Sequence, residues 1–168
     1  MEFDKVIRER KATRKFSDIE VEDEKITKIL EAGRIAPTAK NLQPIKIYVV
    51  KSKEGLEKVD NASPCRYSAS CVFIVCGDKS KSFKKGEYST YEMDSCIVAT
   101  HMMLEATNLG VDNIWVEMFD EDVLRKEFDI PDDLIPICIL PMGYKAIDCP
   151  DSPNHNKRQS LEELVEYK

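Results

Sequence analysis

Apolar and polar residues alternate along the chain with two different spacings. The 3.6-residue period of a helix begins near residue 22 and includes Ile26, Ile29, Leu30 and Gly33. Pro37 ends this predicted helix. Residues 45–50 begin with a two-residue alternation, which predicts a strand. Residues 71–76 are apolar at every position, which predicts a central strand buried on both faces.

The remaining pattern predicts five more helices and two more strands. The helices are expected at residues 4–10, 53–61, 91–109 and 120–128, and after the capping box at Ser160. The strands are expected at residues 113–116 and 135–144, and Pro136 and Pro141 in the latter predict an edge position or bulges. Residues 78–87 are expected to form a loop. No linker or repeat divides the chain, so we expect an α+β fold with one domain over residues 1–168.

The long helix at residues 91–109 has an apolar stripe with two interpretations. The stripe comprises Met93, Ile97, Thr100, Leu104 and Thr107. It can pack into the core of its own chain, which is the commoner case, or against a copy of itself in a dimer.

Composition excludes several function classes. The 168-residue chain carries 25 Lys+Arg against 31 Asp+Glu, a net charge of -6, so a broad basic face for nucleic acid is not expected. Six glycines lie too far apart for the two commonest phosphate-binding loops. With two histidines the chain offers no multi-histidine metal site, and we expect no metal.

The chain start and the cysteines predict a cytoplasmic protein. Residues 1–14 are charged and lack the apolar core of a secretory signal, and no apolar run approaches the ~20 residues that span a membrane. The six cysteines include no C-x-x-C pair. Cys71, Cys76 and Cys138 lie in apolar runs, which favours reduced core thiols over the alternative of a metal or redox cluster.

Three polar segments are candidates for chemistry. Residues 8–15 hold five cations, which form either a solvated helix face or an anion site, since arginine binds phosphate bidentately. Residues 36–44 form either a simple connection or a proline-stiffened loop whose Asn41 and Gln43 could bind a heterocycle edge. The cations of residues 154–158 are either surface charge or a cover for a phosphate.

Taken in order, these segments are similar to the nitroreductase family. Residues 10–16 (RKATRKF) resemble the family pattern R-R-S-x-R-x-F/Y, and residues 36–45 (APTAKNLQPI) resemble A-P-S/T-x-x-N-x-Q-P-W/F. Residues 110–115 after the long helix, the stretch from Ile130 to Tyr144 and the tail at residues 157–163 match further family segments. The resemblance covers nearly the whole chain and implies a mostly antiparallel sheet packed by helices, in a homodimer.

The resemblance implies FMN as cofactor and assigns its ligands. The phosphate and pyrimidine edge would be held by residues of the basic motif, namely Arg10, Lys11 and Arg14, with Ala12 where the family has serine. The proline-rich loop would reach the flavin of the other subunit through Pro37, Thr38, Ala39 and Asn41, supported by Gln43. Arg158, with Lys157, matches a late phosphate ligand. The backbone at Glu117 and Met118 would meet flavin N5. Met118 stands at a position where glycine is common in the family.

The implied reaction needs no catalytic side chain, because the flavin carries the hydride chemistry. NADH or NADPH would reduce the flavin, and a nitroaromatic, quinone or similar acceptor would then oxidise it in a ping-pong cycle. Two alternatives stay open. One is a flavin-binding redox sensor or carrier without turnover, and the other is a small anion- or nucleotide-binding module without flavin.

Overall fold

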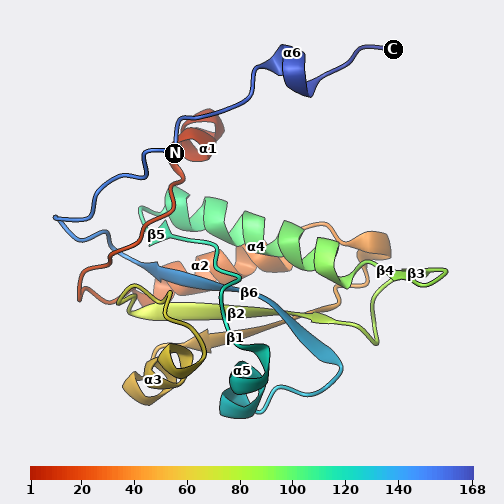
Figure 1. The fold of residues 1–168 in the computed structure, drawn as a ribbon, viewed down its shortest axis with the longest axis horizontal. Helices are drawn as coiled ribbons and strands as arrows, with labels where there is room; N and C mark the ends of the chain where they lie inside the picture. The colour runs from red at the N-terminus through yellow and green to blue at the C-terminus, as the bar shows by residue number, and fades with distance from the viewer.

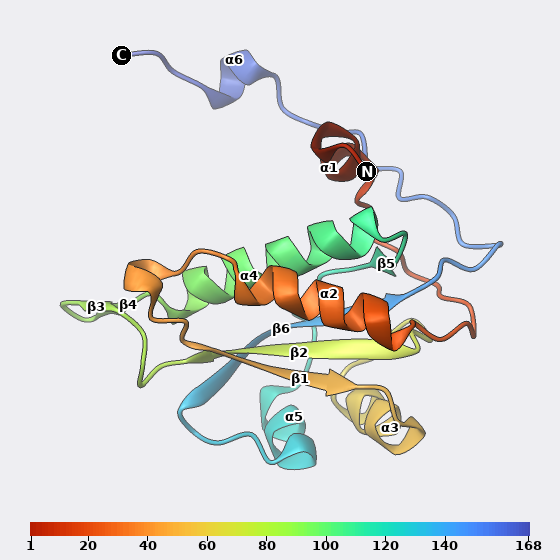
Figure 2. The same ribbon diagram turned by 180° about the vertical axis from the view of Figure 1, so that it is seen from behind.

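Four strands form the central sheet of the computed structural model, which describes all residues from 1 to 168 (Figures 1 and 2). The strand order is β1-β2-β6-β5, and each neighbouring pair is antiparallel. The strands are β1 (Ile45–Val50), β2 (Cys71–Asp78), β6 (Leu134–Gly143) and β5 (Asp112–Asn113). The α+β class and the antiparallel sheet predicted from the sequence are confirmed.

Strand β2 is central, as its apolar run predicts. All eight of its residues are buried between the two neighbouring strands and the helices on both faces. Strand β6 also lies inside the sheet, so the expected edge position is wrong. The alternative of a bulge is correct, because the register slips between Val75 and Cys76, which pair with Cys138 and Pro136 and leave Ile137 unpaired.

Helices cover both faces of the sheet (Figure 1). One face carries α2 (Asp23–Arg34) and α4 (Tyr91–Asn108), with α1 (Phe3–Glu9) beyond α4, and the other carries α3 (Lys53–Ala62) and α5 (Glu121–Phe128). Alternate residues of β2 therefore enter two cores. Phe73 packs with Met102 of α4 in one core, and Ile74 packs with Leu124 of α5 in the other.

Helix α4 turns the predicted stripe away from the core. Met93 is 52% exposed and Ile97 is 37% exposed, whereas a different set faces the sheet and α2, namely Val98, Ala99, Met102, Met103 and Ala106. Thr100 is also exposed, and Leu104 and Thr107 are half-buried, so the interpretation of the whole stripe as core is wrong. Both sides of this helix are rich in apolar residues, so periodicity alone does not identify the buried side.

Two short segments complete the chain. Residues 78–87, expected to be a loop, contain β3 (Lys84–Lys85), which forms a small hairpin with β4 (Tyr88–Ser89) just after them. The C-terminal segment extends away from the body and ends with α6 (Leu161–Leu164), and the predicted capping box joins Ser160 to Glu163 (Figure 1). None of the helices has the length and apolar character needed to cross a bilayer. The cytoplasmic location stays a prediction.

The cysteines form no disulfide, and most are buried. Cys71, Cys76 and Cys138 lie in the core as predicted, and burial raises the pKa of Cys71 and of Cys76 to about 12. Cys96 is exposed and Cys65 is half-buried. These two thiols therefore do not fit the description of core residues.

Candidate functional site

The first basic motif runs as an extended strap along the sheet. Ala12 forms a parallel bridge with Asn113, and the Thr13 N–H donates to the Asn113 carbonyl at 3.1 Å. Thr13 and Phe16 are buried, which fixes the strap, and the Arg14 side chain lies exposed between them. The backbone thus presents Arg14 to solvent from a rigid edge.

The arginines of the chain divide into two groups. Four form ion pairs with carboxylates, namely Arg8, Arg34, Arg66 and Arg125. The other three, Arg10, Arg14 and Arg158, have no carboxylate within ion-pair distance. These three are the arginines predicted to hold the phosphate.

Lys11 differs from Arg10 and Arg14 because its ammonium is already paired. Its Nζ lies 3.2 Å from Asp151, which also pairs with Lys145 at 2.5 Å. Hydrogen bonds from Lys145 and Lys11 lower the pKa of the Asp151 carboxyl. The C-terminal segment therefore neutralises Lys11 in this structure, while Arg10 and Arg14 stay available for an anion.

The segment after Val116 makes a tight turn with two free donors. Val116 pairs with Ile139 of β6, and the Phe119 N–H donates to the Glu117 carbonyl at 3.0 Å. The backbone N–H groups of Glu117 and Met118 have no acceptor within the chain. Uncommitted N–H groups in an ordered turn are suited to an external acceptor.

The segment at residues 63–68 lies beside this turn and was not identified by sequence reasoning. The Cys65 Sγ is 3.9 Å from the Met118 Sδ, and Tyr67 and Ser68 have φ of 56° and 65°. A hydrogen bond with Cys65 and burial raise the pKa of Tyr67, whereas nearby Arg14 acts in the opposite direction. Cys65, Tyr67, Arg14 and Met118 thus lie in one neighbourhood. The only sequence signal is Pro64, which marks a turn.

The proline-rich loop lies next to the β3–β4 hairpin, at the end of the sheet opposite to β5 (Figures 1 and 2). The Ala39 N–H donates to the buried Asp94 carboxylate at 2.8 Å, and the Gln43 N–H donates to Thr38 Oγ1 at 3.0 Å. Three residues of the loop adopt left-handed φ near 50°, namely Lys40, Asn41 and Gln43. Within one chain no hydrogen bond joins the loop to Arg14 or Met118.

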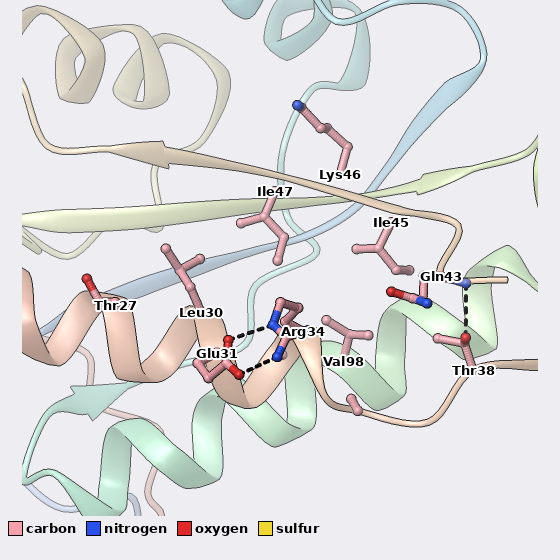
Figure 3. Close-up of a pocket in the computed structure, with 12 residues that line it drawn as sticks. Thr27, Leu30, Glu31, Arg34, Thr38, Gln43, Ile45, Lys46, Ile47 and Val98 are labelled. Carbon is pink, nitrogen blue, oxygen red and sulfur yellow. Dashed lines mark hydrogen bonds and ion pairs between the residues drawn. The ribbon is translucent and has the colours of Figure 1, made fainter. Parts of the chain in front are cut away.

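A cavity of about 520 Å³ opens beside this loop (Figure 3). Its walls come from α2, β1 and α4 and include Leu30, Ile47 and Val98, with Thr38 and Gln43 at one end. Arg34 in its wall is held by Glu31 at 2.5 Å. The cavity contains none of the three unpaired arginines, so one chain does not join the loop to the phosphate-type cations.

Comparison with known proteins identifies the family. The model of the Nitroreductase family matches residues 7–67 and 65–144, which together are most of the chain. The chain belongs to the nitroreductase family. The family resemblance given by the five sequence segments is thereby confirmed, and membership makes the chain an oxidoreductase.

Individual nitroreductase relatives agree with this family. A nitroreductase family protein from Clostridium difficile superposes with a TM-score of 0.92 at 40% identity, covering 100% of this chain and 99% of that one. A relative from Methanothermobacter thermautotrophicus is 33% identical over 83% of this chain and 75% of its own, and is provisionally named NADH dehydrogenase/NAD(P)H nitroreductase. A Staphylococcus epidermidis protein, provisionally named NAD(P)H:FMN oxidoreductase, shares the fold at a TM-score of 0.86 and 22% identity over 99% and 96% of the two chains.

The last predicted site residues of this nitroreductase chain lie on its C-terminal tail. A ring nitrogen of His155 lies 3.1 Å from the Arg8 carbonyl oxygen, which keeps the tail near α1. Beyond it, Lys157 and Arg158 are exposed, and the only hydrogen bond of the Arg158 guanidinium goes to the Lys157 carbonyl at 2.7 Å. The structure thus leaves both cations free of the strap.

Proposed function

We propose that the protein is an FMN-dependent oxidoreductase that passes hydride from NADH or NADPH to a nitroaromatic, quinone or similar acceptor in a ping-pong cycle. Family membership supports the oxidoreductase class, and the names of the relatives support NAD(P)H as donor. The observation that carries the proposal is a set of available donors. The guanidinium groups of Arg10 and Arg14 have no carboxylate partner, and the amides of Glu117 and Met118 have no acceptor within the chain.

These donors fit the chemistry of FMN. The dianionic phosphate and the pyrimidine edge would take the guanidinium donors of Arg10 and Arg14, which form charge-assisted hydrogen bonds. The amides of Glu117 and Met118 would point to N5. Bound FMN would supply the hydride chemistry itself, so the residues need only bind, orient and polarise it.

The two substitutions relative to the family pattern are compatible with this assignment. Ala12 lacks the hydroxyl of the family serine, so one contact to the phosphate or ribityl chain is missing. Met118 is 67% exposed, so its side chain has room in solvent. A backbone donor does not depend on the side-chain type, which supports the N5 assignment.

We also propose that each site is completed by a second copy of the chain. The loop that holds Pro37, Thr38, Ala39 and Asn41 leads into β1 beside the start of β6, whereas the strap that holds Arg14 runs beside β5 and the end of β6, so the loop can reach a flavin there only from another chain. The exposed α4 stripe at Met93 and Ile97 offers apolar surface for such a partner. The tail adds Leu161, Leu164 and Tyr167, which are 76%, 66% and 94% exposed.

The test uses the full chain purified as it is expressed. A flavin absorbance spectrum, anaerobic bleaching by NADH or NADPH, and recovery of colour on adding a nitroaromatic or quinone are the expected results. A flavin spectrum without bleaching would instead identify a sensor or carrier. A protein that neither contains nor binds FMN would overturn the proposal.

A further inference from the structure

Ser63 joins the two segments that surround the free amides. It lies just after α3, is 1% exposed, and its hydroxyl donates to the Met118 carbonyl at 2.6 Å. The Ser63 Oγ in turn accepts a hydrogen bond from the Cys65 N–H at 3.1 Å. A second link runs beside it, from the Asp120 N–H to the Ala62 carbonyl at 2.8 Å. One buried side chain therefore holds both segments together.

These bonds fix one peptide plane. The carbonyl of the Met118–Phe119 peptide is held by Ser63, and the N–H of the same peptide donates to the Glu117 carbonyl at 3.0 Å. Because a peptide group is planar, both ends of this unit are held in one orientation. The preceding amides of Glu117 and Met118 are the donors left without an acceptor.

We propose that Ser63 is a positioning residue that sets the reduction potential of the flavin by fixing the direction of the Glu117 and Met118 amides. This inference rests on the proposed function. In oxidised flavin N5 has a lone pair that accepts an N–H hydrogen bond, whereas in reduced flavin N5 carries a hydrogen and is itself a donor, so amides aimed at N5 favour the oxidised form. A loosened turn would lose this preference, so oxidised flavin would bind more weakly while the phosphate contacts of Arg10 and Arg14 persist.

The experiment compares Ser63→Ala with Ser63→Thr, which keeps a hydroxyl, and with Ser95→Ala. Ser95 is 0% exposed and its hydroxyl donates to the Tyr91 carbonyl at 2.7 Å on α4, so it controls for the loss of a buried serine bond elsewhere. For Ser63→Ala we expect about tenfold weaker binding of oxidised relative to reduced FMN, which raises the two-electron midpoint potential by about 30 mV. Ser63→Thr and Ser95→Ala should keep the wild-type potential.

A second measurement needs no flavin. Amide hydrogen exchange of residues 116–120 in the apoprotein should accelerate in Ser63→Ala and not in Ser95→Ala. If Ser63→Ala does not fold, Ser63→Cys replaces the hydroxyl by a weaker donor and should shift the potential in the same direction. An unchanged potential in the folded Ser63 variants would overturn the positioning role alone. A wild-type protein that binds no FMN would overturn the proposed function and this role together.

Discussion

Arg8 and Arg14 belong to the same N-terminal cluster of cations, but only Arg8 has a carboxylate partner. Arg8 pairs with Asp4 at 2.9 Å, whereas Arg14 lies exposed and unpaired. An unpaired guanidinium can bind an anion without first breaking an ion pair. The backbone that carries Arg14 is already fixed by the buried Thr13 and Phe16, so binding requires little ordering of the main chain.

The first prediction follows from this difference. Arg14→Ala, and likewise Arg158→Ala, should weaken FMN binding by about 1–3 kcal/mol, the range for a lost charge-assisted hydrogen bond. Arg8→Ala, which removes an equal charge nearby, should leave the affinity close to wild type. Titration of apoprotein with FMN, followed by flavin fluorescence, measures all three. Equal affinities in wild type and Arg14→Ala would contradict the phosphate assignment.

Asp78 gives a prediction about stability and pH. Desolvation raises the pKa of this buried carboxyl, but hydrogen bonds from Lys81 and Ser80 outweigh it and lower the pKa to about 2. A folded-state pKa below the unfolded value of roughly 3.9 means that the stabilisation is complete above about pH 4 and is lost as the pH falls toward 2.

Urea unfolding of wild type and Asp78→Asn should show this window. Near pH 6 the variant should be less stable by about 1–3 kcal/mol, the range for hydrogen bonds to a charged group. The difference should shrink steadily between pH 4 and pH 2. A difference that stays constant over this range would mean that the Asp78 carboxylate charge does not stabilise the fold.

At the scale of elements, the sequence predicted the features that depend on interactions between residues close together in the chain. The Asp120 cap of α5 and the Ser160 capping box form as predicted, because caps depend on neighbours in sequence. The side of α4 that faces the sheet was not predictable, since packing against β2 and α2 chooses between two apolar sides. The Ser63–Met118 bond was not predictable either, because it joins residues 55 positions apart.

The contact between β2 and α4 carries the third prediction. A Cβ added at Gly77 would lie 2.8 Å from Tyr91 Cδ2 and 3.0 Å from the Tyr91 carbonyl oxygen. The backbone atom cannot move aside without shifting α4. Gly77→Ala should therefore destabilise the protein by about 1–3 kcal/mol, the usual cost of overpacking. Chemical denaturation measures it, and an unchanged midpoint would mean that α4 does not approach β2 this closely.

At the scale of the whole molecule, the reactivity of each thiol measures whether the surface around it is accessible to solvent. Cys65 and Cys96 should react with an aromatic disulfide reagent in the native protein, and the four buried cysteines only after unfolding. The high pKa of Cys71 and Cys76 adds to this protection, since the thiolate is the reactive form. In a dimer formed through α4, Cys96 should react more slowly at high protein concentration than at low. Equal rates would argue against that face.

The exposed α4 stripe can be tested by charge. Ile97 is 37% exposed in one chain, so Ile97→Arg should cost the isolated fold little, but it would bury a cation in a dimer interface. Ile19→Arg places the same charge at a 61% exposed residue outside α4 and serves as the control. Light scattering should give a dimer for wild type and Ile19→Arg and a monomer for Ile97→Arg.

FMN binding should follow the oligomeric state in the same samples, because Pro37, Thr38, Ala39 and Asn41 are proposed to reach the flavin from the second chain. The monomeric Ile97→Arg should bind FMN more weakly although its Arg10 and Arg14 are intact. If Ile97→Arg stays a dimer, the interface lies on another face of the molecule. If it becomes a monomer and keeps full FMN affinity, the site is built by one chain, and the loop at residues 37–44 has a role other than cofactor binding.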